Sequence, residues 1–456
     1  MSLLQRLEKQ KAIQQTETIE QAPARRPAAG YSGGAAVNLE EFAEVKQKVH
    51  AAVINLVNES NDINTYTQVE QAEFVREAIE TALNEQDADI PRAVRGRFIE
   101  EVFNDIIGLG PLEPLLADPD ITEVMVNGYD KVYVEIRGKI EQTDVKFRDN
   151  AHVMNVINRI VSSVGRRIDE SSPMVDARLA DGSRVNAVIP PVALSGPTIT
   201  IRKFSKTPLG VSDLIRFSSV SPQMMAFLEA CVKARMNIIV SGGTGSGKTT
   251  LLSVLSGFIP ENERIVTIED AAELRLQQKH VITLESRPAN VEGAGAITIR
   301  DLVRNALRMR PDRIVVGEVR SGETLDMLQA MNTGHDGSLT TAHANSPRDL
   351  MSRLETMVLM SGMEMPVTAI REQVSSALDL IVHQARLRDG SRKIVSITEV
   401  VGMEGDTITL QDIYVYKPAG NGDSMRDAFV ATGTRPTFAE KMADNGIMVK
   451  DEWFQN

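Results

Sequence analysis

Hydrophobic residues recur every three or four positions between residues 38 and 108, the spacing typical of amphipathic helices. The first segment carries Phe42, Val45, Val49, Val53 and Leu56, and two similar segments follow before a Gly-Leu-Gly-Pro stop at 108–111. This pattern predicts a small helical unit over residues 38–108. Residues 1–37 are rich in Ala, Pro and Gly and hold few apolar side chains, so we expect a disordered tail there.

The hydrophobic period shortens to two over residues 109–205, which favours β-strands. One helix candidate, at residues 152–164, lies among them. The expected strands are Glu123–Gly128, Lys131–Gly138, Ser183–Ile189 and Thr198–Phe204. We therefore expect a smaller mixed α/β domain at 109–205.

The second half of the chain has the pattern of a larger α/β domain. Residues 206–220 resemble a linker, and the Ser-Pro pair at 221–222 is a typical helix start. From Met236 to about residue 400, short apolar strands alternate with helical segments, which predicts a parallel sheet covered by helices. The remaining residues predict an appended pair of strands and a short terminal helix, so the domain with its C-terminal extension is expected to span 221–456.

Composition narrows the class of protein. Hydrophobic residues make up 42% of the 456 residues, which is enough for several cores, and the net charge of −12 argues against a nucleic-acid partner. A single cysteine, Cys231, excludes an internal disulfide and a multi-cysteine zinc site, and its position beside a helix's apolar face favours a core residue. The chain start lacks a secretory signal, and no apolar stretch reads as a membrane span. We expect a cytoplasmic protein unless a partner holds it at a membrane.

One glycine-rich segment decides the chemistry. It follows the apolar strand Ile238–Val240, precedes a helical segment, and matches the pattern G-x-x-x-x-G-K-[ST]. Glycines let successive backbone N–H groups face phosphate oxygens, and the helix N-terminus adds positive potential there. Lys248 can reach the β- and γ-phosphates, and the Thr249 hydroxyl can ligate Mg²⁺. The expected nucleotide-binding residues are Gly242, Gly243, Thr244, Gly245, Ser246, Gly247, Lys248, Thr249 and Thr250.

Two later strands end in carboxylates. The strand Ile265–Ile268 is followed by Glu269 and Asp270, with Glu273 close behind, and the strand Ile314–Val316 is followed by Glu318. Because the carboxyl ends of parallel strands face the ligand crevice of such sheets, these side chains are expected near the nucleotide. A carboxylate there can hold Mg²⁺ through water, or orient and deprotonate an attacking water.

Two of the six histidines lie together in the segment after residue 331. His343 follows the expected strand Ser338–Ala342, and its imidazole could sense a γ-phosphate through a hydrogen bond. A structural role is the competing interpretation for a histidine at a strand end. No third metal ligand with suitable spacing accompanies His335 and His343, so a metal site here has little support.

In this order the four segments resemble the motifs of the type II/type IV secretion and pilus ATPase superfamily. The segment GGTGSGKTT matches its Walker A motif, RIVTIEDAAEL its acidic box, MRPDRIVVGEVRSGET its atypical Walker B motif, and TGHDGSLTTAHANSP its histidine box. Upstream, GLGPLEPLLADPDITEVMVNG and DGSRVNAVIPP resemble more closely the CpaF/TadA-type ATPases that assemble Tad (Flp) pili.

The resemblance implies a RecA-like ATPase core with a smaller N-domain, ATP and Mg²⁺ as ligands, and a homo-hexameric ring. It implies Glu318 as general base, Glu269 or Glu273 as organisers of Mg²⁺ and water with Glu269 and Thr249 nearest the metal, and His343 as a γ-phosphate sensor. The family also supplies arginines from the N-domain. By motif position these are Arg184 and Arg202, whose competing interpretation is a solvated charge at a strand end.

The expected function is therefore a motor that drives assembly of a Tad-type pilus through an inner-membrane platform protein. The motifs leave open whether the same motor also retracts the pilus. The chain would associate peripherally with the inner membrane through that partner. The absence of a four-cysteine zinc insertion favours this branch over many type II secretion members. A type IV secretion ATPase for conjugation or effector export is the neighbouring alternative. A soluble P-loop kinase is the alternative from a different class.

Overall fold

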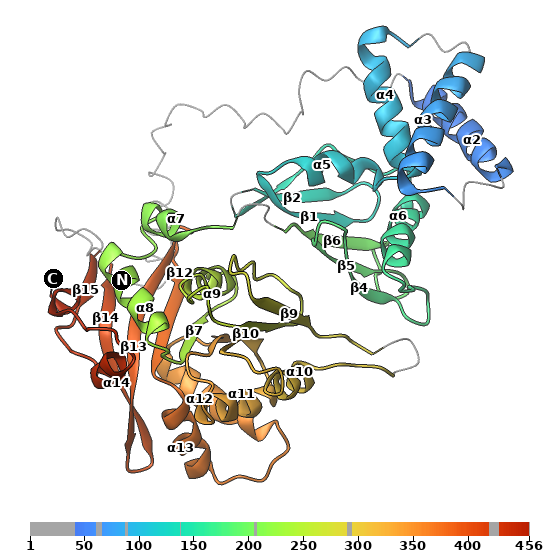
Figure 1. Ribbon diagram of the computed structural model, residues 1–456. Helices are drawn as coiled ribbons and strands as arrows, with labels where there is room; N and C mark the ends of the chain where they lie inside the picture. The colour runs from blue at the N-terminus through green and yellow to red at the C-terminus, as the bar shows by residue number, and fades with distance from the viewer. Residues whose placement is uncertain are drawn as a thin grey trace, which may run out of the picture. The chain divides into compact units, whose positions relative to one another are not determined.

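The computed structural model describes residues 42–60, 66–86, 90–136, 138–204, 208–289, 294–418 and 428–455 (Figure 1). The chain divides into two compact units, the first ending at Phe204 and the second beginning at Ser205. Each unit combines helices with one β-sheet, which confirms the predicted α/β class. The predicted tail at 1–37 lies outside the described residues. None of the described helices is long and apolar enough to cross a membrane.

Three helices open the first unit: α2 (Ala43–Glu59), α3 (Gln68–Glu85) and α4 (Arg92–Ile106). Helix α3 begins at a capping box in which Thr67 and Glu70 satisfy each other's backbone N–H groups. The apolar positions that recur at helical spacing in the sequence face one another and form a separate core, with Val49, Ile79 and Phe98 fully buried. Burial of this face holds the three helices together.

The rest of the first unit is a six-stranded antiparallel sheet. In spatial order its strands are β3 (Lys139–Gln142), β2 (Val132–Ile136), β1 (Ile121–Asn127), β6 (Thr198–Arg202), β5 (Arg184–Val188) and β4 (Met174–Arg178). Three helices, η3 (Gly110–Leu112), α5 (Glu113–Ala117) and α6 (Asn150–Ser163), supply apolar side chains to the same core as the sheet. The strand residues alternate between buried and exposed, as expected for a sheet covered on one face.

A polar cluster joins the three-helix bundle to this layer. Asp105, near the end of α4, is buried and forms an ion pair with Lys46 of α2, with Oδ2 and Nζ 3.0 Å apart. From α6, the Arg159 guanidinium donates to the main-chain oxygens of Asp105 and Gly108. His152 of α6 is also buried, and its Nε2 lies 3.8 Å from Oδ1 of Asp105. These contacts cap the C-terminal end of α4 and attach the bundle to the sheet layer.

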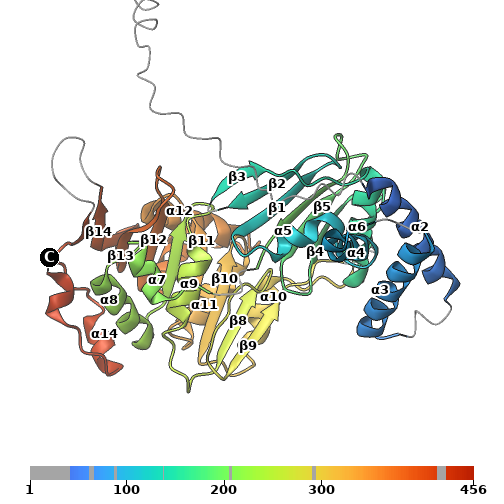
Figure 2. The same ribbon diagram turned by 90° about the horizontal axis from the view of Figure 1, so that it is seen from above.

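The second unit is built on a nine-stranded sheet, seen from a second direction in Figure 2. Six neighbouring strands run parallel to one another, namely β12, β7, β11, β10, β8 and β9. Strands β13, β14 and β15 continue the sheet beyond β12 as an antiparallel edge. In spatial order the strands are β15 (Ala428–Ala431), β14 (Thr407–Lys417), β13 (Arg392–Glu404), β12 (Leu380–Arg386), β7 (Ile238–Gly242), β11 (Leu339–His343), β10 (Arg313–Val319), β8 (Ile265–Glu269) and β9 (Val281–Glu285).

Helices cover both faces of this sheet (Figure 1). One core contains α8 (Pro222–Lys233), α9 (Lys248–Ser256), α14 (Ala439–Asp444) and η4 (Asp451–Phe454), while α7 (Val211–Arg216) contributes Leu214. The other contains α10 (Ile299–Ala306), α11 (Glu323–Asn332), α12 (Pro347–Leu359) and α13 (Val367–Ala377). Alternate residues of β7 enter the two cores, so this central strand is buried on both sides, as is typical of parallel sheets.

The second unit contains two features predicted from the sequence, the core position of Cys231 and a C-terminal pair of strands. Cys231 of α8 is fully buried among apolar side chains, and burial raises the pKa of its thiol well above the ordinary value, so it is a core residue. The predicted strands RKIVSITEV and TITLQDIYVY correspond to β13 and β14, which continue the main sheet beyond β12. Phe227, Tyr414 and Trp453 pack together and tie the chain's last residues to α8.

Candidate functional site

The predicted phosphate loop lies between β7 and α9, with backbone angles that glycine adopts readily. Gly245 and Gly247 have φ of 70° and 96°, in the region that side chains disfavour. At Gly242 a Cβ atom would lie 2.1 Å from the main-chain oxygen of Gln384 in the neighbouring strand β12. These positions therefore require glycine, for backbone conformation at two of them and for close approach of another strand at the third.

The loop presents its backbone to solvent. Gly243, Thr244 and Gly245 are exposed, and Ser246 turns inward, where its hydroxyl donates to the main-chain oxygen of Gly243 at 2.9 Å. Helix α9 begins at Lys248, so its free N–H groups and Thr249 and Thr250 lie directly after the loop. A concave backbone at a helix N-terminus fits the phosphates of a nucleotide, and the Thr249 hydroxyl in the first helical turn fits the Mg²⁺ ion that accompanies them.

Lys248 lies at the base of the loop and is largely buried. Its ammonium group donates to the main-chain oxygen of Gly243 at 3.0 Å and to Nδ1 of His343 at 3.3 Å. Burial lowers the pKa of Lys248, and the carboxylate of Glu318 opposes this effect. A cation held in this way beside three exposed loop residues is positioned for a phosphate group.

His343 connects this lysine to a carboxylate. Strands β7, β11 and β10 are neighbours in the sheet, so the chain brings the residues at their carboxyl ends together. Because an ammonium group only donates, Nδ1 of His343 is the acceptor and the ring proton lies on Nε2, which is 3.0 Å from Oε1 of Glu318. Burial and the charge of Lys248 lower the pKa of His343, which favours the neutral ring.

Glu318 has one committed oxygen and one without a hydrogen bond. Its Oε2 accepts from Arg320 at 2.7 Å. Its Oε1 is buried and, within the part of the chain that the structure describes, receives no aligned hydrogen bond despite the nearby imidazole. A buried carboxylate oxygen in this state is suited to accept a proton or a hydrogen bond from a substrate water.

Arg320 was not among the residues predicted from the sequence. It contacts both Glu318 and Asp270, with Nη1 3.5 Å from Oδ2 of the latter, and Asp270 in turn accepts from Ser286. The hydrogen bond with Glu318 raises the pKa of Arg320. Its signal in the sequence was its position two residues after the strand-end glutamate, in the same segment.

Glu269 is buried beside Gly317, at the end of β8. Both of its oxygens accept backbone hydrogen bonds from the turn that follows, from Glu273 at 2.9 Å and from Leu274 at 3.1 and 3.3 Å. Burial raises the pKa of Glu269 to about 7. In this arrangement Glu269 orders the turn, Glu273 contributes its main chain to that contact, and a role for either side chain with Mg²⁺ and water stays a prediction.

Two further polar residues lie beneath the loop. His383 of β12 and Ser241 of β7 are buried side by side, with Nδ1 and Oγ 2.8 Å apart. Burial lowers the pKa of His383. This contact holds the strand that leads into the phosphate loop against β12. The sequence offered no sign of it, because these two residues lie far apart along the chain.

The two predicted arginines lie in the first unit. Arg184 of β5 and Arg202 of β6 are directly opposed in the antiparallel register, and both are exposed. Arg202 forms an ion pair with Glu123 on β1, with Nε and Oε1 3.3 Å apart. Phosphoryl contact by either arginine stays a prediction.

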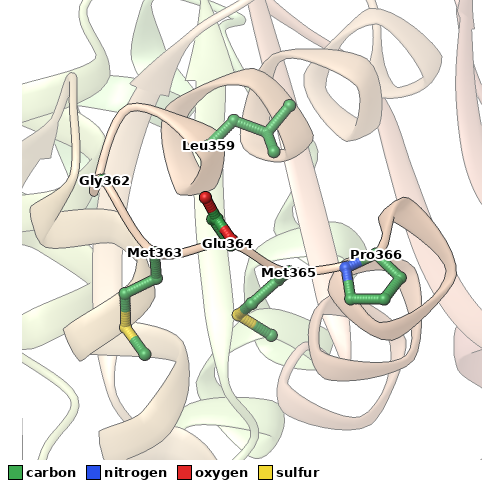
Figure 3. Close-up of a pocket in the computed structure, with 6 residues that line it drawn as sticks. All are labelled: Leu359, Gly362, Met363, Glu364, Met365 and Pro366. Carbon is green, nitrogen blue, oxygen red and sulfur yellow. The ribbon is translucent and has the colours of Figure 1, made fainter.

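A concave surface of a different character lies on the loop between α12 and α13 (Figure 3). It is a hollow of about 550 Å³, and Met363 and Met365 flank Glu364 on the loop that forms it. It contains none of the residues predicted for nucleotide binding. The functional site is therefore assigned to the carboxyl ends of the strands and not to this hollow.

The segment that contains the candidate site is similar to known proteins. Residues 105–420 match the family model described as "Type II/IV secretion system protein". A putative conjugal transfer protein of Mycobacterium tuberculosis is 39% identical over 307 residues, covering 66% of this chain and 87% of the relative. The type IV secretion system protein VirB11 of Brucella abortus is 34% identical over 316 residues, covering 63% and 87%.

One solved structure is also similar in sequence. The crystal structure of the VirB11 ATPase of Brucella suis, in complex with sulphate, is 32% identical, covers 63% of this chain and 94% of its own, and has a TM-score of 0.35. The segment matched by the family model, residues 105–420, includes the phosphate loop, Glu318 and His343. The family model covers more than half of the chain, and the chain therefore belongs to the type II/IV secretion system protein family.

Proposed function

We propose that the chain is an ATPase that hydrolyses ATP at the phosphate loop and uses the energy to move a secretion or pilus machine. The observation that carries this proposal is the linked set Lys248, His343 and Glu318, in which a phosphate-binding cation and a carboxylate contact the same imidazole. A loop that only bound nucleotide would not need a buried carboxylate oxygen beside it.

The chemistry assigns one task to each residue. Lys248 binds the β- and γ-phosphates, and the exposed loop backbone binds the phosphate oxygens. Glu318 orients the attacking water and accepts its proton through Oε1, while the water oxygen forms a bond to the γ-phosphorus and the bond to ADP breaks. Neutral His343 contacts the γ-phosphate. Mg²⁺, held by Thr249 and through water by Glu269, would offset negative charge on the phosphates.

The resemblance of the upstream segments to CpaF/TadA-type ATPases supports a more specific role. We propose a homo-hexamer that drives assembly of a Tad-type pilus by pushing on an inner-membrane platform protein. Arg184 and Arg202 would then contact the phosphates, as the family resemblance implies. Successive ATP hydrolysis around the ring would drive the motion of the machine.

A second candidate function is supported by the relatives themselves. A putative conjugal transfer protein and VirB11 of a type IV secretion system are among the relatives that match the chain. An ATPase for conjugation or effector export would use the same site with a different membrane partner. Capture of the chain from its own cells, followed by identification of the membrane protein retained, distinguishes the two functions.

The ATPase proposal is tested with Lys248→Ala. We expect this variant to fold normally, to lose nucleotide binding by calorimetry and to lose ATP turnover, since it removes the buried cation that contacts both Gly243 and His343. Unchanged turnover would refute the site. The hexamer is tested separately, because specific activity should rise with protein concentration, whereas full activity in a strictly monomeric enzyme would exclude the ring.

A further inference from the structure

Strand β12 and the turn after it lie against the phosphate loop from the side opposite to Glu318. In the sheet, β7 has β11 and then β10 on one side and β12 on the other. His343 and Glu318 come from β11 and β10, so under the proposed function the γ-phosphate of a bound nucleotide would face that side. The nucleoside therefore leaves the loop toward β12.

The β12–β13 hairpin reaches the loop at three of its glycines. The main-chain oxygen of Gln384 closes over Gly242, and the Gln384 side-chain amide lies 3.4 Å from where a Cβ of Gly247 would be. Arg392 of β13 donates from Nε to the main-chain oxygen of Gly245 at 2.9 Å. The hairpin thus packs along one side of the phosphate loop. Main-chain contact at Gly242 and the Arg392 hydrogen bond to Gly245 hold it there.

The turn of this hairpin is well defined. The N–H of Leu387 donates to the main-chain oxygen of Ser391 at 2.8 Å, and the carboxylate of Asp389 accepts from both the N–H and the hydroxyl of Ser391. Gly390 has φ of 87°, which suits a tight turn. The backbone at the end of β12 therefore has a defined position relative to the loop.

Arg386 is the last residue of β12, and its side chain projects from this position. Its Nη1 lies 3.9 Å from the position of a Cβ on Gly245, so the guanidinium stands over the exposed middle of the loop. Arg386 is itself exposed and, among the described residues, it forms no ion pair. A planar cation in this place can stack on a purine ring and donate to a ribose hydroxyl.

We propose that Arg386 binds the nucleoside part of the nucleotide, with its guanidinium against the base and ribose. The inference rests on the proposed function and adds to it a contact that lies within the same unit as the phosphate loop. It also gives a task to the end of β12, which lies on the opposite side of β7 from β10 and Glu318.

The test compares a nucleotide with a ligand that lacks the nucleoside. Binding of ADP, ATP and inorganic tripolyphosphate to the full chain is measured by calorimetry, in the presence of Mg²⁺. In Arg386→Ala we expect roughly tenfold weaker binding of ADP and ATP, the size of a cation–π contact partly removed from water. The affinity for tripolyphosphate should change by no more than about twofold, because this ligand lacks the base and ribose that Arg386 is proposed to contact. A factor of two corresponds to well under 1 kcal/mol.

Matched variants separate the possible causes. Arg388→Ala removes the same charge from the adjoining turn and should leave the affinity for all three ligands unchanged. Arg386→Lys should restore the nucleotide affinity only in part, because an ammonium group lacks the planar face and the paired donors of a guanidinium. Equal weakening of ATP and tripolyphosphate, an equal effect in Arg388→Ala, or wild-type affinity in Arg386→Ala would each overturn the proposal. If the unaltered chain bound neither ligand, the proposed function itself would fail, and the two failures are therefore distinct.

Discussion

Nε2 of His343 lies 3.0 Å from Oε1 of Glu318, while Nδ1 of the same ring accepts from Lys248. One imidazole thus contacts both the cation predicted to bind phosphate and the carboxylate proposed to accept the proton. A shift of the lysine on binding of a γ-phosphate would therefore displace this ring, and with it the surroundings of the carboxylate. The site is therefore better described as one linked unit than as separate motifs.

Replacing Glu318 with Gln should abolish hydrolysis while preserving nucleotide binding. The amide keeps the size of the side chain but cannot accept the proton of the attacking water, so we expect kcat to fall by roughly 10²- to 10⁴-fold. The Kd for ATP, measured by calorimetry, should change little. Glu261→Gln, at an exposed position away from the strand ends, is the matched control. A turnover within a factor of about two of wild type would remove Glu318 from the role of general base.

Replacing His343 with Ala should lower kcat more than it changes nucleotide affinity. The loss leaves Lys248 and Glu318 without the group that lies between them, and we expect a decrease of about tenfold to a hundredfold, below the full loss of a general base. His343→Gln should recover part of the activity, because its amide can both accept and donate. Equal activities in the Ala and Gln variants would contradict a hydrogen-bonding role for this residue.

Arg320 is a positioning residue whose contribution can be separated from charge alone. Arg320→Ala releases Oε2 of Glu318, which should broaden the orientations of the carboxylate and lower kcat, with KM largely unaffected. Arg320→Lys should restore part of the rate, since an ammonium group reaches one of the two carboxylates. If KM rose and kcat did not fall, Arg320 would instead act on substrate binding.

The strand-end residues could be predicted from sequence, and the contacts across the sheet could not. Glu318 and His343 lie at the carboxyl ends of apolar strands, and parallel strands bring such positions to the same edge of the sheet. Arg386 approaches Gly245 only because β12 lies next to β7, and no local pattern specifies which strand is that neighbour. The burial of Glu269 likewise depends on Gly317 in an adjacent strand, so its raised pKa was out of reach of the sequence.

Arg202→Ala should impair hydrolysis more than nucleotide binding if this arginine reaches the phosphates. Glu123→Gln is the matched control, because it removes the ion pair within the sheet and keeps the arginine. An exposed pair of this kind contributes about 0–1 kcal/mol to stability, so neither change should unfold the unit. Equal ATP turnover in wild type and Arg202→Ala would assign Arg202 to the sheet surface alone.

The buried His152 should make the first unit less stable in mild acid. Burial lowers the pKa of His152 to about 4, and the charges of Arg148 and Lys46 act in the same direction, while Asp105 and Asp149 oppose them. The unfolded chain takes up a proton near pH 6.5 that the folded unit refuses until about pH 4. Stability is therefore full above pH 6.5 and is lost as the pH falls toward 4.

The expected loss between pH 7.5 and pH 5 is up to about 2 kcal/mol, and it concerns the contact between α4 and α6. Hydrogen exchange of peptides from residues 92–106 and 150–163 measures it in the full chain. In His152→Gln, which cannot take up a proton, the acid-dependent loss of protection should shrink by that amount, while His50, present in both chains, contributes equally. Fluorescence of Trp453 reports on the second unit. Its pH dependence should be the same in the wild type and in His152→Gln, since His152 lies in the first unit. An unchanged acid dependence in the variant would show that another group controls the stability of the first unit.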